Sequence, residues 1–280
     1  MGESNEGMTF WDHLEDLRWT LIRAIIALVV FAIVGFILMP YIYDQWIMGP
    51  TRADFFLYKY LCKATSAIPF FPDFCDDTYH VKIINYNLTS QFFRHMTTSF
   101  WLALIMTFPY LIFEVWRFVK PALYDIEKRK IRWVFLFGTI MFFIGCAMGY
   151  SLVFPMTFRF LATYQLSDMI ENTISLDSYM DNFLMLIFIM GIVFELPLIS
   201  WLLSQLGILN RSFFSKFRRH AIVGLLFLAA FITPSSDPFT LSVVFLPLYL
   251  LFELSRFMVK PAPPKEEEDE EDENSLQVNE

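Results

Sequence analysis

Residues 19–39 read WTLIRAIIALVVFAIVGFILM, and they contain a single charged side chain, Arg23. A run of about 20 apolar residues can cross a membrane as a helix, because the hydrocarbon core is about 30 Å thick and a helix rises about 1.5 Å per residue. This stretch therefore predicts a transmembrane helix and decides the fold class.

Five more apolar segments follow along the chain. Three of them are long enough to span a bilayer and lie at residues 98–119, 133–161 and 180–206. The other two, 221–233 and 240–254, are short and flank a turn that contains Pro234 and Pro238. They predict a hairpin of two short helices, beside which the bilayer would thin; alternatively, they are re-entrant segments packed against the other four helices. The predicted fold is an all-α integral membrane protein with six transmembrane helices, the last two short.

The basic residues of the loops predict the orientation, because Lys and Arg close to a helix end stay in the cytoplasm. Residues 120–132 and 211–219 are rich in Lys and Arg, whereas residues 162–179 hold only acidic charges. Both termini are therefore predicted to be cytoplasmic. No small-residue cleavage site follows the first apolar segment, so no cleaved signal peptide is expected.

The overall composition agrees with a membrane protein. Hydrophobic residues make up 56% of the 280 residues and charged residues only 18%, with a mean hydropathy of +0.48. These values exclude a soluble enzyme. The net charge of −8 comes from the tail KEEEDEEDENSLQVNE at 265–280, and the rest of the chain is balanced, so no basic nucleic-acid surface is predicted.

Composition divides the chain into three parts. Residues 1–18 form an amphipathic cytoplasmic segment, and residues 19–256 form the membrane domain, whose long first loop, about 40–97, is predicted to lie outside. Residues 257–280 form an acidic tail that cannot bury a core and is predicted to be disordered in the cytoplasm. The tail is expected to aid solvation; alternatively, it binds a basic partner segment.

Sites for covalent or metal chemistry are scarce. Cys62 and Cys75 lie in the first loop, where an oxidising compartment would permit a disulfide, but spacing alone leaves their pairing open. Cys146 lies in the third span, where packing is its expected role. The four histidines stand in no metal-ligand spacing and no nucleophile or phosphate-loop motif occurs, so neither an enzyme nor a metal or cofactor site is predicted.

An ionisable residue stands in the middle of the fourth span. Glu195 lies in the run IMGIVFELPLIS at 189–200, two residues before Pro197. A carboxyl group in hydrocarbon is costly, which makes Glu195 a functional candidate, and the missing N–H of Pro197 predicts a kink. Alternatively, Glu195 is a neutral carboxylic acid that is hydrogen-bonded to a neighbouring helix.

Other charged residues of the spans have simpler interpretations. Glu114 is predicted to pair with Arg117, one helical turn later. Arg23 and Arg159 lie near the ends of their spans, and their long side chains are expected to reach water there.

The first cytoplasmic loop offers carboxylates to a ligand. It reads VKPALYDIEKRKIRW at 119–133 and holds Asp125 and Glu127 among basic residues. A carboxylate can bind a guanidinium group through two parallel hydrogen bonds, a geometry that an ammonium group cannot reproduce. This loop is therefore a candidate site for an arginine-bearing ligand.

Several sequence strings together resemble one family, TatC, the polytopic subunit of the twin-arginine (Tat) protein translocase. The strings are HLEDLR (13–18), GP (49–50), FPYLIFEVWRFVKPALYDIEKR (108–129), FELP (194–197) and TPSSD (233–237). The resemblance implies a multi-pass protein of the bacterial cytoplasmic (inner) membrane. It would bind Arg-Arg signal peptides of folded cargo at the cytoplasmic face. It would assemble with single-span TatA-like and TatB-like proteins, self-associate, and export the cargo with the proton-motive force.

The resemblance also implies which residues bind the signal peptide. Glu127 would contact the two arginines, and Phe118 and Leu123 would shape the loop around it. Asp16 stands where the family has a glutamate. Because aspartate is one methylene shorter, the neighbouring Glu15 is an alternative ligand.

Further positions are implied elsewhere in the fold. Glu195, with Pro197, would be the polar residue of a concave groove for partner helices or the signal peptide. Pro50 matches the family's proline after the first span, and Asp237 its acid in the last periplasmic turn, although TPSSD carries one extra residue. Residues 51–82, with both loop cysteines, resemble an insertion that shorter family members lack.

Two other functions remain open at this point. The first is a proton-coupled small-solute transporter in which Glu195 takes up and releases a proton. The sequence argues against it, because the two halves show no repeat and no broken Gly-rich helices occur at corresponding positions. The second is a scaffold whose carboxylates only orient the protein.

Overall fold

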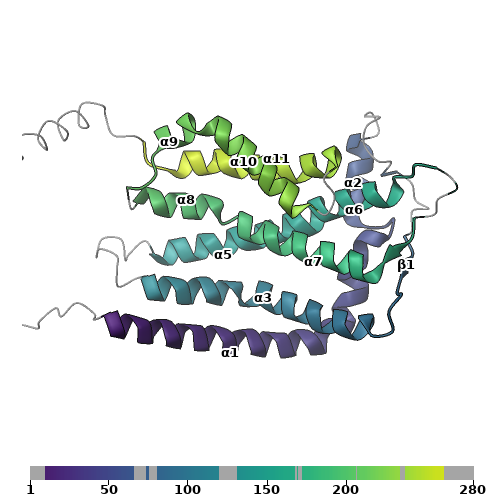
Figure 1. Cartoon of the computed structure of the whole chain (residues 1–280), viewed down its shortest axis with the longest axis horizontal. Coiled ribbons are helices and arrows are strands. Elements are labelled where there is room, and N and C mark those ends of the chain that lie inside the picture. The colour runs from purple at the N-terminus through teal and green to yellow at the C-terminus, as the bar shows by residue number, and fades with distance from the viewer. Residues whose placement is uncertain are drawn as a thin grey trace, which may run out of the picture.

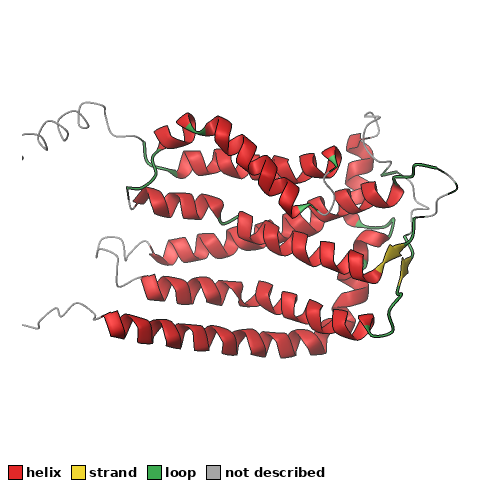
Figure 2. Ribbon diagram, viewed as in Figure 1, coloured by secondary structure: helices red, strands yellow, loops and turns green. Residues whose placement is uncertain are grey.

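The computed structural model is an elongated bundle of helices (Figure 1). It describes residues 10–65, 74–75, 81–119, 131–167, 169, 172–205, 207–233 and 237–261. Figure 2 shows that nearly all of the described chain is helical, apart from one small pair of strands. The predicted acidic tail lies outside the described residues, apart from its first few.

Five helical segments of the described chain are long and apolar enough to cross a membrane. These segments are Leu14–Thr51, Ser90–Val115, Leu136–Thr163, Leu176–Gln205 and Pro238–Met258. The chain is therefore a multi-pass membrane protein built from α-helices. The fifth of the six predicted spans is not among them, because its helix has only 15 residues.

The long helices are joined by shorter elements. In chain order they are α1 (Phe10–Ile42), η1 (Tyr43–Ile47), η2 (Gly49–Thr51), α2 (Phe56–Thr65), β1 (Ile83–Ile84), α3 (Ser90–Val119), α5 (Ile131–Met148), η4 (Gly149–Val153), α6 (Phe154–Thr163), β2 (Ile174–Ser175), α7 (Leu176–Val193), α8 (Leu196–Gln205), α9 (Arg211–Lys216), α10 (Arg218–Ile232) and α11 (Pro238–Met258). Strands β1 and β2 pair in parallel, with Ile83 opposite Ile174.

Successive spans run in opposite directions, which gives the bundle two distinct ends (Figure 1). The α9 end carries α9, the start of α1 and the end of α3. The cap end carries α2, the end of α1 and the start of α7. The first and last described residues both lie at the α9 end.

The first span is longer than expected. The sequence placed a loop after Pro40, but α1 continues to Ile42 and is followed by the π-helix η1 and the 3-10 helix η2. A proline lacks the N–H that would bond the carbonyl four residues earlier, here that of Phe36. The Nε2–H of His95 in α3 donates to this carbonyl at 2.9 Å, and its ring stacks on Phe36. The helix therefore continues because a neighbouring helix satisfies the freed group.

The last two helices differ in length. The fifth predicted span, α10, is short, and 15 residues reach about 22 Å along the helix axis. The sixth was expected to end at residue 254, but α11 has 21 residues and ends at Met258. The prediction that both are short was therefore wrong for α11. Hydropathy falls after Leu254, but the helix continues for four more residues, in which Arg256 pairs with Glu253 across one turn.

The most buried part of the bundle lies where α5 packs on α7. Glycines allow the close approach: a Cβ on Gly145 would lie 2.6 Å from the Met190 carbonyl oxygen, and one on Gly191 would lie 2.7 Å from the Cys146 sulfur. Cys146 itself is buried at this contact, as expected of a packing residue. Most of α7 is buried, whereas α1 packs mainly on α3 and leaves most of its apolar surface exposed.

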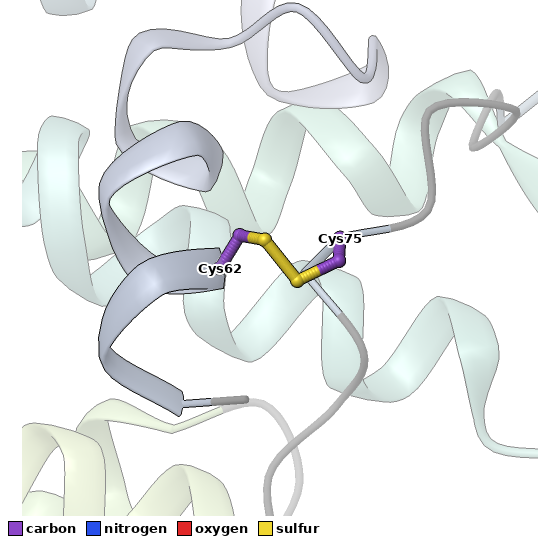
Figure 3. The surroundings of a disulfide bond; sticks show 2 residues. All are labelled: Cys62 and Cys75. Atoms are coloured by element: carbon purple, nitrogen blue, oxygen red, sulfur yellow. A yellow bond between two sulfur atoms is a disulfide. The ribbon is translucent and has the colours of Figure 1, made fainter. Parts of the chain in front are cut away.

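The described part of the first loop folds onto the cap end of the bundle. We call residues 51–65 with Phe74 and Cys75 the cap. Its aromatic side chains pack against α6 and the start of α11, and Figure 3 shows that a disulfide joins Cys62 in α2 to Cys75. The Tyr58 hydroxyl donates to the Pro50 carbonyl oxygen at 2.7 Å, which ties the cap to η2.

The cap corrects the prediction for Arg159. The sequence indicated that this side chain reaches water, but only 1% of the residue is exposed. Its guanidinium lies 4.6 Å from the centre of the Tyr58 ring and 5.2 Å from that of Phe74. Cation–π contacts of this kind stabilise a charge that has lost its water. The cap therefore supplies part of the surroundings of a buried cation in the third span.

Removal of the disulfide is expected to loosen the cap. The two cysteines are 13 residues apart, and closing a loop of about 15 residues is worth about 3 kcal/mol through the entropy of the unfolded chain. We expect reductant to lower the Tm of the purified protein in a fluorescence-detected thermal scan. The double variant Cys62→Ser/Cys75→Ser should start from the lower Tm and not respond to reductant. An equal Tm in all four conditions would contradict this role.

Candidate functional site

Those residues predicted to bind a signal peptide that the structure describes lie in two helices, which meet at the α9 end. Glu15 and Asp16 lie in the second turn of α1, and both are exposed. Phe118 is in the last turn of α3, where only its backbone is described. Leu123 and Glu127 lie outside the described residues. The start of α1 and the end of α3 lie side by side at this end of the bundle (Figure 1).

An ion pair joins these two helices below the exposed acids. In α1, Arg23 donates to Glu114 in α3 through Nε at 3.0 Å and through a terminal nitrogen at 2.8 Å. The Tyr110 hydroxyl donates to the same carboxylate at 2.9 Å, and Arg23 also donates to Thr20 at 3.1 Å. Thr20 and Arg23 lie four and seven residues after Asp16, so all three lie on one face of α1. We call this contact the α1–α3 clamp.

The α1–α3 clamp corrects two sequence predictions. Arg117 is not the partner of Glu114, and Arg23 does not simply extend to water. Glu114 is only 2% exposed, whereas 33% of the Arg23 side chain is. The geometry is the two-pronged arginine–carboxylate contact that fixes orientation best. Because Glu114 is already bound to an arginine of the chain, it is not free to bind one of a ligand.

Glu195 interrupts the fourth span. Helix α7 ends at Val193 and α8 begins at Leu196, so the predicted kink takes the form of a break at Phe194 and Glu195. The Glu195 N–H donates to the Ile192 carbonyl at 3.0 Å, and the Glu195 carbonyl accepts from the Ile199 N–H at 2.9 Å. Pro197 is buried in the first turn of α8, where it has no N–H to donate to Val193.

The Glu195 carboxyl group faces α5. The residue is 7% exposed, and a Cβ on Gly138 would lie 3.2 Å from its Oε2 atom. Oε1 is buried and accepts no hydrogen bond from any described residue. The sequence left open a hydrogen bond to a neighbouring helix, and the described part of the chain provides none for Oε1. A buried polar atom without a partner is costly and is a candidate for contact with a ligand or proton.

Two further predicted positions have structural contacts. Pro50 is buried in η2, and its carbonyl accepts the Tyr58 hydroxyl of the cap. Asp237 caps α11, because its carboxylate accepts from the Thr240 N–H at 2.8 Å. These contacts position the two residues at the cap end, away from the carboxylates of α1.

Sequence reasoning missed a charged cluster at the cap end. Arg94 in α3 donates to Asp177 of α7 at 2.7 Å and also pairs with Asp181. The Ser90 hydroxyl donates to Asp177 at 2.8 Å. A signal was present, because Arg94 lies just before the predicted second span, on the same side of the membrane as the acidic loop 162–179. The cluster holds α3 to α7 at the ends opposite the candidate site.

Known proteins resemble the chain over nearly its whole length. A family model described as "Sec-independent protein translocase protein (TatC)" matches residues 12–247. A TatC protein of Blattabacterium sp. subsp. Periplaneta americana is 32% identical over 91% of this chain and 96% of its own length. A TatC protein of Deinococcus radiodurans is 30% identical over 92% of this chain and 89% of its own length.

Solved structures agree with this result. A crystal structure of the twin-arginine translocase receptor TatC in DDM superposes with a TM-score of 0.70 at 27% identity, covering 89% of this chain and 99% of the solved one. A second crystal structure of the receptor gives a TM-score of 0.66, also at 27% identity, and covers 88% and 97%. Members of this family are components of a protein translocase and are not enzymes. By fold and by sequence, the chain belongs to the TatC family of Sec-independent protein translocase proteins.

Proposed function

We propose that this TatC protein is the signal-peptide receptor and core subunit of a twin-arginine translocase. Glu127 binds the paired arginines of a folded cargo's signal peptide, with Glu15 or Asp16 as a second carboxylate. Phe118 and Leu123 shape the loop. The observation that carries the proposal is that the described segments leading to these positions, the start of α1 and the end of α3, are held together by the α1–α3 clamp.

The proposed topology has six spans with both termini in the cytoplasm. It is supported by the common location of the first and last described residues at the α9 end (Figure 1), where Arg211, Lys216 and Arg219 also lie. This end would face the cytoplasm of a bacterial cell and the cap the periplasm. Helix α10 falls short of the roughly 30 Å hydrocarbon core, so the bilayer would thin beside it, whereas α11 is long enough to span.

The proposed partner groove is centred on Glu195. Glu195 lies at the break between α7 and α8, and no described residue donates a hydrogen bond to its Oε1 atom. A polar group of a TatA-like or TatB-like helix, or of the inserted signal peptide, would satisfy it. Export would draw on the proton-motive force, and copies of the chain would self-associate around the cargo.

Photo-crosslinking tests the receptor function. A probe placed near Glu127 should label a twin-arginine signal peptide, and the labelling should fall at least about tenfold with a Lys-Lys peptide or with Glu127→Ala, because both remove the two-pronged contact. Asp125→Asn tests the other carboxylate of the loop, and a loss of labelling with Asp125→Asn but not with Glu127→Ala would assign the contact to Asp125. Equal labelling of both peptides, or none, would contradict the receptor function and reopen the transporter and scaffold alternatives.

A further inference from the structure

An apolar cavity lies between four helices at the cap end of the bundle. It has a volume of about 620 Å³ and lies between the end of α1, the middle of α3, the end of α5 and the middle of α7. Residues from each helix line it, among them Ile42, Leu102, Ala147 and Leu184. The lining is almost wholly apolar and belongs to helices that are long and apolar enough to cross a membrane, so water would be a poor occupant.

A second cavity with different chemistry adjoins it. This one has a volume of about 350 Å³ and is bounded by η1, η2 and the cap, with Arg52 and Asp54 in its lining. The two cavities share Trp46 and Tyr150 as lining residues. The Tyr150 hydroxyl donates to the Trp46 carbonyl at 2.9 Å, which fixes the shared wall. An apolar chamber therefore adjoins a charged one.

The charges of the second cavity are available to a ligand. Arg52 and Asp54 are both exposed, and neither forms an ion pair with a residue that the structure describes. Trp46 is 60% exposed beside them, and tryptophan favours the boundary between lipid tails and headgroups. In a bilayer, the second cavity would therefore lie near the headgroups, and its lining holds one cation and one anion.

We propose that these two cavities form a binding site for a zwitterionic glycerophospholipid. One acyl chain fills the apolar cavity. The phosphate lies on the Arg52 guanidinium, which can bind two phosphate oxygens at once. The positively charged amine lies between the Asp54 carboxylate and the aromatic rings of Trp46 and Phe56.

The pairing of charges decides between classes of lipid. A headgroup with a net negative charge would gain from Arg52 but be repelled by Asp54. A zwitterionic headgroup matches both. The site would anchor the cap to the leaflet on its side of the membrane. The proposal requires that the chain is inserted in a membrane, but it does not rest on the receptor function proposed above.

Native mass spectrometry of the full chain in detergent tests the site. The protein would be titrated with phosphatidylethanolamine and phosphatidylglycerol that carry the same acyl chains. We expect the first to be retained about tenfold better, and Arg52→Ala to weaken retention of both lipids by about tenfold, because each contact involves a charged group. Asp54→Asn should increase the retention of phosphatidylglycerol, because the repulsion is removed, and should thereby reduce the difference in retention between the two lipids.

Two variants separate the site from general lipid adhesion. Ala147→Phe, which places a ring in the apolar cavity, should abolish retention of both lipids, and the exposed Ala147 position should tolerate it without loss of folding. Arg219→Ala removes an exposed arginine at the α9 end and should leave retention unchanged. Equal retention of both lipids, insensitive to Arg52→Ala and Ala147→Phe, would overturn the proposal.

Discussion

Replacement of Arg23 by methionine is expected to destabilise the protein strongly. The variant would leave the Glu114 carboxylate, which is 2% exposed, with the Tyr110 hydroxyl as its remaining partner in the described chain. The pair is only partly buried, because 33% of the Arg23 side chain is exposed, but the variant would leave the Glu114 charge almost wholly buried without its cation, which is strongly unfavourable. The fall in stability should appear as a lower Tm and as weaker protection of the α1–α3 clamp in hydrogen exchange.

Two further variants distinguish the clamp from the pairing that the sequence suggested. The double variant Arg23→Met/Glu114→Gln removes both charges and should recover most of the lost stability. Arg117→Met should change stability by no more than about 0.5 kcal/mol, because Arg117 is exposed and Glu114 is bound to Arg23 instead. A larger loss for Arg117→Met than for Arg23→Met would contradict the clamp.

Replacement of Gly145 by alanine is expected to force α5 away from α7. The new Cβ would lie 2.6 Å from the Met190 carbonyl oxygen and 2.8 Å from the Phe194 Cβ. A backbone carbonyl cannot rotate away as a side chain can, so the helices must separate. Overpacking of this kind costs about 1–3 kcal/mol and sometimes more. Because Phe194 lies next to Glu195, the break in the fourth span should shift as well.

Gly224 provides the matched control. It lies in α10, and a Cβ at this position would have no described atom within 4 Å. Gly224→Ala should therefore be neutral or gain up to about 1 kcal/mol from the higher helix propensity of alanine. Thermal scans and protease resistance of the two variants give the comparison. Equal stability of Gly145→Ala and the parent protein would show that α5 and α7 are less tightly packed than the structure indicates.

Sequence reasoning predicted the spans well where hydropathy carries the information. The first segment, 19–39, lies within α1, and the long third segment corresponds to α5, η4 and α6 together. Helix ends were harder, because they depend on contacts between helices. The chain continues past Pro40 as helix since His95, far away in the sequence, donates to the freed carbonyl. Hydropathy contains no information about such a donor.

The candidate site was predictable in part. The break at Glu195 followed from Pro197, whose missing N–H is a local property of the sequence. The partners of Arg23 and Arg159 could not be predicted in the same way. Each arginine could contact several polar or aromatic groups on other segments. Which of these groups it contacts depends on which segments are adjacent in the fold. The assignment of Glu127 rests on the resemblance to TatC proteins and on its place in the first cytoplasmic loop.

The aromatic cap over Arg159 bears on the biogenesis of the chain. Tyr58 and Phe74 are made roughly one hundred residues before Arg159, so the ribosome releases them while the third span is still being synthesised. A guanidinium that enters the bilayer edge alone would have to draw water in with it. If the cap has already closed with its disulfide, the arriving cation meets two rings instead. The cap would thereby assist the membrane insertion of its own polypeptide, and a chain with the cap deleted should integrate its third span less efficiently.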